Sequence, residues 1–205
     1  MTIDPAIHPR PLPLRADEPA SRPPRPGRRP RRSRRARLTA GLLLLAACTA
    51  APADPVAEAT ELGVPRVAAP LPGVITAAQP SQAQVDELRS RGYRNFISLR
   101  LPTESGAGWE ETHLPAAGSN FARIPISGAD DLTRENVEAL DDLLDDAEGE
   151  TTLLYCASSN RVGALLALRA FWFEGADADA ALALGREAGL MGLEPAVREI
   201  LAEGR

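Results

Sequence analysis

Cys156 and Arg161 are the residues of this chain whose types and spacing could do chemistry together. The apolar run 151–155 predicts a short buried strand that leads into the cysteine. The almost wholly apolar run from Val162 to Phe173 predicts a buried helix after the arginine. A strand, a tight polar loop and a helix in this order aim several backbone N–H groups at one point. Such a point binds anions and favours the thiolate form of a cysteine, so we expect a reactive thiol in a cationic loop.

The loop between the strand and the helix is predicted to bind an oxyanion. Arg161 would hold two of its oxygens with the planar guanidinium, which a lysine could not do as well. A cysteine in this setting can also be an inert, buried, apolar residue. The hypothesis therefore requires Cys156 to be accessible, with the guanidinium beside it. The residues expected to bind the substrate through their backbone N–H groups are Ala157, Ser158, Ser159 and Asn160.

The pair formed by Cys156 and Arg161 resembles the Cys-to-Arg loop of cysteine-dependent phosphatases (protein tyrosine and dual-specificity phosphatases) and of rhodaneses. Over about residues 72–205 the chain more closely resembles the bacterial beta-lactamase-hydrolase-like phosphatase-like family, whose members are also labelled sulfur transferases. The resemblance implies that Cys156 attacks phosphorus and forms a phosphocysteine intermediate. The further segments that match this family are Ala77–Ser81, Asn95–Arg100, Arg123–Ile126, Gly189–Leu190 and Leu193–Arg198.

Asp130 and Asp131 are the candidates for the general acid that protonates the leaving alcohol. They follow the predicted third strand, in about the region where related phosphatases place this acid. One of the two could instead support the N-terminus of the next helix. Arg100 could reach the substrate anion, but the expected role is an ion pair with Glu104 or another carboxylate.

Several positions depart from the phosphatase pattern. The spacing is Cys-x4-Arg rather than the Cys-x5-Arg of protein tyrosine phosphatases, and this shorter loop is nearer to rhodaneses. Tyr155 replaces the histidine that usually precedes the cysteine, and Val162 replaces a serine or threonine. Ser159 stands where family members commonly have glycine, so a positive φ at this position would strain the serine.

Three hypotheses for the function follow. The first is a cysteine-dependent phosphatase that acts on small-molecule or protein phosphoesters. The second is a sulfurtransferase of the rhodanese type, in which Cys156 carries a persulfide. The third is a non-catalytic module that binds phosphorylated or other anionic ligands. None of the three needs a cofactor, and no spacing of residues predicts a metal site.

Charge divides the chain into two parts. Residues 1–47 hold eleven of the 23 basic residues and three acids, whereas residues 48–205 hold 12 Arg against 25 Asp and Glu, a net charge of −13. Nucleic-acid binding requires basic faces. The acidic part is therefore not expected to bind nucleic acid.

The basic residues near the N-terminus lead into a predicted signal peptide. An arginine-rich run at 31–37 precedes an apolar run at 38–47, which is shorter than the roughly 20 residues that span a bilayer. The sequence around Cys48 matches a bacterial lipobox, which implies cleavage before Cys48 and lipidation of its thiol. Cys156 would then be an unpaired thiol in a compartment that favours disulfides.

The expected organisation follows from this processing. A signal peptide would cover residues 1–47, a lipidated Cys48 with an Ala/Pro-rich tether would cover 48–71, and a phosphatase-like domain would cover 72–205. The protein would be exported and anchored by lipid to a bacterial membrane, on its periplasmic or extracellular face.

The domain is predicted to be an α/β fold with a small, mostly parallel sheet of four to five strands, flanked by helices. In such sheets, ligands bind beyond the carboxyl ends of the strands, which is where Cys156 and Arg100 would lie. We expect an edge strand at Val74–Thr76 and further strands at about 93–99 and 121–126. Helices are expected to begin near Ser81, near Thr133, at either Asp177 or Asp179, and near Pro195.

Overall fold

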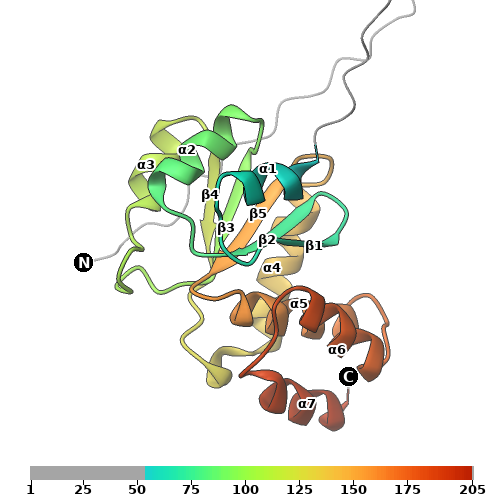
Figure 1. Cartoon of the computed structure of the whole chain (residues 1–205). Coiled ribbons are helices and arrows are strands. Elements are labelled where there is room, and N and C mark those ends of the chain that lie inside the picture. Colours follow the sequence, from blue (N-terminus) through green and yellow to red (C-terminus); the bar gives the residue numbers. More distant parts are fainter. Residues whose placement is uncertain (1–53, 205) are drawn as a thin grey trace, which may run out of the picture. The chain divides into compact units, whose positions relative to one another are not determined.

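The computed structural model describes residues 54–204 (Figure 1). The predicted signal peptide at 1–47 and the predicted lipidation site at Cys48 lie outside the described residues. In the described part, no helix is both long enough and apolar enough to cross a membrane.

Strands and helices alternate along most of the described chain, as the sequence predicts. The strands are β1 Ala68–Leu71, β2 Val74–Ala78, β3 Asn95–Ser98, β4 Asn120–Arg123 and β5 Thr152–Cys156. The helices are α1 Pro55–Glu61, α2 Gln82–Ser90, α3 Glu110–Ala116, α4 Arg134–Asp146, α5 Asn160–Trp172, α6 Ala178–Glu187 and α7 Glu194–Glu203, with a 3-10 turn, η1, at Ala129–Asp131.

The five strands form one sheet in the order β1-β2-β5-β3-β4. Strands β2, β5, β3 and β4 run parallel, and only β1 pairs antiparallel, with β2. The predicted fold class, a mostly parallel sheet of up to five strands with flanking helices, is confirmed. Because β5 is the central strand, its last residue, Cys156, lies in the middle of the row formed by the carboxyl ends of the parallel strands.

Two expectations about the start of the domain are wrong. The predicted tether at 48–71 contains α1 and β1, so the folded part begins by Pro55 rather than near Pro72. β2 is an inner strand and not the edge strand, because β1 pairs with it through a tight connection at Pro72-Gly73. Gly73 has a φ of 74°, which suits glycine in a turn that follows proline.

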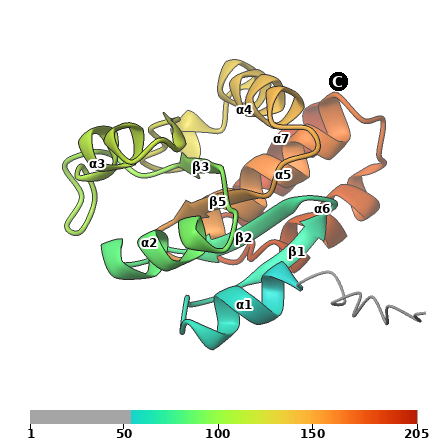
Figure 2. The same cartoon turned by 90° about the horizontal axis from the view of Figure 1, so that it is seen from above.

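Helices cover both faces of the sheet, as Figures 1 and 2 show. On one face, α1, α2 and α3 pack on alternate strand residues such as Ile75, Phe96 and Leu153. On the other face, α4, α5, α6 and α7 enclose the larger core, to which Leu154 and Cys156 belong. This alternation is the period-two pattern of a strand buried on both sides.

Side-chain caps set the start of three of the predicted helices. Ser81 caps α2 and forms a capping box with Gln84. Thr133 caps α4 and Asp177 caps α6, and each side chain accepts a hydrogen bond from an N–H group of the first turn. These three predicted starts are confirmed.

Helix α5 is the most buried helix of the described part, and α6 approaches it closely. The approach depends on two glycines, Gly163 in α5 and Gly185 in α6. A Cβ atom added to Gly163 would lie 2.4 Å from the carbonyl oxygen of Gly185 and 2.2 Å from the backbone nitrogen of Leu190. The N-terminal turn of α5 is therefore held in place by backbone packing, and this turn carries Arg161.

Candidate active site

The carboxyl ends of three parallel strands bring the candidate residues to one edge of the sheet. Cys156 is the last residue of β5, and it pairs in register with Ala78, the last residue of β2. Gln79 follows directly after β2, and Arg100 lies two residues beyond the end of β3. This is the arrangement that the sequence predicts for ligand binding in a parallel sheet.

The loop after Cys156 presents unused backbone donors. Within residues 54–204, the N–H groups of Ala157 to Arg161 make no hydrogen bond, because they precede the first backbone bond of α5, from the Gly163 N–H to the Ser159 carbonyl. The N-terminus of a helix also carries a partial positive charge. The loop therefore has the donors and the polarity that an anion requires.

Ser159 adopts a left-handed backbone conformation, with φ of 66° and ψ of −5°. This is the positive φ that favours glycine, so the serine carries strain at this position. Its Oγ donates a hydrogen bond to the Ala188 carbonyl at 2.8 Å. A Cβ atom added to Gly189 would lie 2.6 Å from the Ser159 Cβ, so the absence of a side chain at 189 makes room for the serine.

The segment between α6 and α7 also holds the next residue of the loop. The Oδ1 atom of Asn160 accepts hydrogen bonds from the backbone N–H of Met191 at 2.7 Å and of Leu193 at 3.2 Å. The side chain of Asn160 thus fixes the loop to the C-terminal helices. The predicted role of Asn160 in substrate binding uses its backbone N–H, which these contacts leave unbonded.

Arg161 turns toward the carboxyl ends of β5 and β3. Its Nη1 donates to Glu104 at 2.7 Å and to the carbonyl of Ile126 at 2.6 Å, while Nη2 donates to Glu104 at 2.8 Å. Hydrogen bonding to Glu104, with smaller contributions from the adjacent Cys156 sulfur, raises the pKa of Arg161. The guanidinium is therefore beside the sulfur, as the hypothesis requires. Its Nε edge lies outside the ion pair with Glu104.

Glu104 joins the two arginines of the site. It accepts two hydrogen bonds from Arg161, one from the Nε of Arg100 at 3.0 Å and one from the Leu101 N–H at 2.8 Å. The hydrogen bond from Arg161 is the largest cause that lowers the pKa of Glu104 to about 2. The expected ion pair between Arg100 and Glu104 is confirmed.

Cys156 is completely buried in this structure. A pocket of about 350 Å³ opens at the Asn160-Arg161 end of the loop, next to Glu104 and Ser127-Gly128, but Cys156 does not line this pocket. The expectation of an accessible thiol is therefore wrong for this conformation. The reason is that Cys156 points to the core formed by α4 to α7, where it packs with apolar side chains.

The two candidate acids have different settings. The carboxylate of Asp131 accepts hydrogen bonds from both the N–H and the hydroxyl of Ser127, and these bonds lower the pKa of Asp131. A carboxylate held in its ionised form is a poor proton donor, so Asp131 stabilises the turn before α4. Asp130 is exposed, on the same turn as Asp131 and close in sequence to the pocket residue Gly128. It is the better of the two candidates.

A buried polar network lies on the other face of the sheet, behind the cysteine. Glu110 is fully buried, forms an ion pair with Arg123 at 3.1 Å and accepts hydrogen bonds at 3.3 Å from both Tyr155 and Gln79. Burial, followed by the charge of Glu110, raises the pKa of Tyr155 well above its usual value. Gln79 in turn accepts from Arg100 at 3.0 Å, so the network reaches the Glu104 ion pair.

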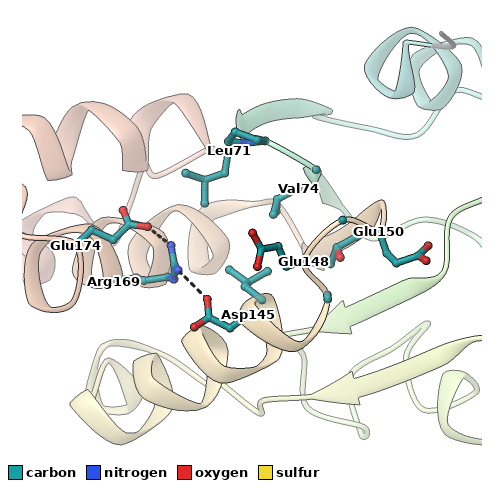
Figure 3. Close-up of a pocket in the computed structure, with 13 residues that line it drawn as sticks. Leu71, Val74, Asp145, Glu148, Glu150, Arg169 and Glu174 are labelled. Atoms are coloured by element: carbon teal, nitrogen blue, oxygen red, sulfur yellow. Dashed lines mark hydrogen bonds and ion pairs between the residues drawn. The ribbon is translucent and has the colours of Figure 1, made fainter. Parts of the chain in front are cut away.

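An acidic residue of α4 lines a second pocket, which is separate from the candidate site. Figure 3 shows Arg169 between Glu174 and Asp145, in a pocket lined also by Gly73 and Thr152, at the opposite end of the strands from Cys156. Asp141 also contacts Arg169, at 2.7 Å. Two of the acids on α4, Asp141 and Asp145, thus pair with Arg169. Across residues 54–204, no group of three or more His, Cys, Asp or Glu side chains is arranged to hold a metal ion.

Comparison with known proteins adds to this geometry. The sequence matches no protein-family model and no curated protein. A Shewanella putrefaciens CN-32 protein provisionally described as a phosphatase (DUF442) is similar in structure, with a TM-score of 0.55 and 19% sequence identity over 71% of this chain and 94% of that chain. The chain has a phosphatase fold.

Two further solved structures agree. A protein from Neisseria meningitidis Z2491, provisionally described as a phosphatase, has a TM-score of 0.53 and 26% identity over 64% of this chain and 93% of that chain. Tk-PTP in its active form has a TM-score of 0.53 and 18% identity over 69% of this chain and 99% of that chain. The fold class expected from the Cys-to-Arg resemblance is thus confirmed.

Sequence reasoning missed two parts of the site. It did not predict that Glu104 would bind Arg161, nor that Glu110 would lie buried behind Tyr155. The signal for Glu104 was its position in a loop that begins at the carboxyl end of a predicted strand. The signal for Glu110 was absent, because a lone glutamate in a polar stretch is normally exposed.

We predict that Ser159 and Gly189 are energetically coupled. Gly189→Ala should lower the free energy of unfolding by about 3 kcal/mol, because the new Cβ meets Ser159 and the glycine has a φ of 105°. In a Ser159→Gly background this cost should fall by about 1 kcal/mol or more. Urea unfolding of the two single variants and the double variant measures the coupling. Gly192→Ala is the control, since its Cβ meets nothing closer than 3.7 Å. Additive effects of the two substitutions would contradict the prediction.

We predict that Glu104 contributes a stability that depends on pH. Its folded pKa of about 2 is lower than the ordinary value of 4.5, so this stability is present above pH 4.5 and is lost as pH falls toward 2. Glu104→Gln should therefore destabilise the protein at pH 7, and the difference from wild type should shrink below pH 4.5. Urea unfolding between pH 7 and pH 3 measures it, with the exposed Glu203→Gln as control. A difference that stays constant over this range would refute the assignment.

Proposed function

We propose that this protein is a cysteine-dependent phosphatase that hydrolyses phosphate monoesters. The observation that carries the proposal is the placement of the Arg161 guanidinium beside the Cys156 sulfur, at the carboxyl end of the central strand of a phosphatase fold. The unused N–H groups of the loop support the same conclusion, because an anion would satisfy them.

The proposed reaction has two steps. The Cys156 thiolate forms a bond to phosphorus while the ester P–O bond breaks, and Asp130 gives a proton to the leaving oxygen. In the second step, the oxygen of a water molecule forms a bond to phosphorus, the Asp130 carboxylate accepts a proton from that water, and the P–S bond breaks to release inorganic phosphate and the Cys156 thiolate. Arg161 and the loop N–H groups stabilise the charge that develops on the equatorial oxygens.

Burial of Cys156 sets a condition on this reaction. Because the sulfur has no contact with solvent, the loop must move when a phosphoryl group arrives. The ion pair with Glu104 leaves the Nε edge of Arg161 for the phosphate, so Glu104 can keep the guanidinium in place during turnover. The same burial favours a second candidate, a module that binds anionic ligands through Arg161 without turnover.

Turnover of p-nitrophenyl phosphate tests the proposal. In the full-length protein, Cys156→Ser should abolish turnover, with a loss of at least about 10³, because the hydroxyl is a far weaker nucleophile. Arg161→Lys should reduce kcat/KM by about 10²-fold, because it removes the bidentate contact but keeps the charge. Circular dichroism and thermal unfolding of each variant confirm that the fold is intact.

Other outcomes of that experiment have clear meanings. Turnover that survives Cys156→Ser would exclude catalysis by this thiol. Phosphate binding without turnover would favour the non-catalytic module. Thiocyanate formation from thiosulfate and cyanide that depends on Cys156, without phosphatase activity, would assign a sulfurtransferase.

We also propose that the protein is exported and anchored to a bacterial membrane by lipid on Cys48. The support is the lipobox match at Leu45-Ala46-Ala47-Cys48, after the basic and apolar runs. Production in a bacterial host should yield a protein that enters the detergent phase of a Triton X-114 extraction. A Cys48→Ser variant should stay in the aqueous phase. Equal partition of the two proteins would exclude the anchor.

A further inference from the structure

Arg66 stands out among the residues that the proposed reaction does not use. It lies between α1 and β1 and has a φ of 56°. Among the non-glycine residues of 54–204, only Arg66 and Ser159 of the cysteine loop have a positive φ. Such a conformation is unfavourable for a residue with a side chain and persists only where the surrounding structure holds it.

Two chains of contacts place Arg66 beside the cysteine loop. The carbonyl of its neighbour Pro65 accepts a hydrogen bond at 2.8 Å from the N–H of Ala78, the residue that pairs with Cys156 across the sheet. On the other side, the Nη1 of Arg66 lies 3.1 Å from the sulfur of Met191. The backbone N–H of Met191 donates to Asn160 in the loop, so Arg66 spans from the end of β2 to the α6–α7 segment.

The charge of Arg66 is not neutralised. It is exposed and forms no ion pair within the described residues, although these carry a large excess of acids. Most other arginines of the same part do form ion pairs, among them Arg91, Arg100, Arg123 and Arg186. The thioether of Met191 is only a weak acceptor and carries no charge. Arg66 is thus a cation that is free to meet an anion from solution.

The position of Arg66 relative to the pocket at Arg161 indicates which kind of anion it could bind. Asn160 and Leu193 line the pocket beside Arg161, and Met191 lies between these two residues in the hydrogen-bonded segment. Met191 is also 44% exposed, the only large apolar residue of the described part with such exposure. Met191 and Arg66 lie outside the lining of this pocket, but the hydrogen bond from the Met191 N–H to Asn160 and the contact of Arg66 with Met191 connect an exposed apolar side chain and a cation to its rim.

We propose that Arg66 and Met191 form a second binding subsite, which selects phosphomonoesters that carry another anionic group. Met191 contacts the apolar body of the substrate, and Arg66 pairs with the second anion while Arg161 holds the phosphate. This inference rests on the proposed function, since it takes the pocket at Arg161 as the phosphate site. A local cation of this kind also offsets the net charge of −13 of residues 48–205 when a substrate with several negative charges approaches.

Binding to a Cys156→Ser variant of the full-length protein tests the inference without turnover. The probes are 4-carboxyphenyl phosphate and 4-carbamoylphenyl phosphate, which have similar shape and differ by the carboxylate charge. Calorimetric titration at low salt should give a dissociation constant about three- to fivefold lower for the carboxylate, the size expected for one exposed ion pair. The preference should decline at high salt because the pair is screened.

Three further variants identify the residue responsible. In the same Cys156→Ser background, Arg66→Gln should abolish the preference, and Arg66→Lys should restore most of it. Arg94→Gln is the matched control, since Arg94 is also exposed and forms no ion pair in the described part, but precedes β3 at the opposite end of the sheet. It should leave the preference intact. Equal affinity for the two probes, a preference that survives Arg66→Gln, or no binding of either probe would overturn the subsite.

Turnover by the wild type separates this inference from the proposed function. A charge preference in binding without hydrolysis of either probe would keep the subsite and reject the phosphatase. Hydrolysis of both probes without a charge preference in binding would keep the phosphatase and reject the subsite.

Discussion

The ion pair between Glu104 and Arg161 is the interaction on which the rest of the site depends. Arg161 carries a charge in a largely buried place, and a buried charge without a partner costs several kcal/mol. Glu104 offsets this cost with a bidentate contact and is itself held by Arg100 and the Leu101 N–H. Through Gln79 the same network reaches Glu110 and Tyr155 on the other face of the sheet. The ion pair and this network therefore link the two ends of the cysteine loop to side chains on both faces of the sheet.

The architecture was predictable because its signals are local. The apolar runs at β5 and α5, and the caps at Ser81, Thr133 and Asp177, set elements whose positions the structure confirms. The helix α3 was not predicted, because Trp109 provides no side-chain cap and Pro115 lies inside the helix. α1 and β1 were hidden by an Ala/Pro-rich composition that is typical of a linker. There, pairing with β2 and packing against the sheet determine the structure, and both are tertiary effects.

The site was predictable in its residue types but not in its contacts. The loop from Cys156 to Arg161, and the pairing of Arg100 with Glu104, follow from spacing and charge. The burial of the sulfur does not, because whether a residue at the end of a strand faces solvent or a helix layer depends on how the helices pack. The contact of Arg66 with Met191 was also not predictable, because the two residues are 125 positions apart in the sequence and only the packed fold brings them together.

The strained serine in the loop has a consequence for how this protein can change over time. Its Cβ and Oγ occupy space that exists only because residue 189 has no side chain. In an ancestor with glycine at position 159, position 189 would have tolerated a larger residue more readily. Once serine is present at 159, glycine at 189 can no longer be replaced without loss. The order in which the two substitutions arise therefore decides which evolutionary routes stay open, and reversal must begin at 159.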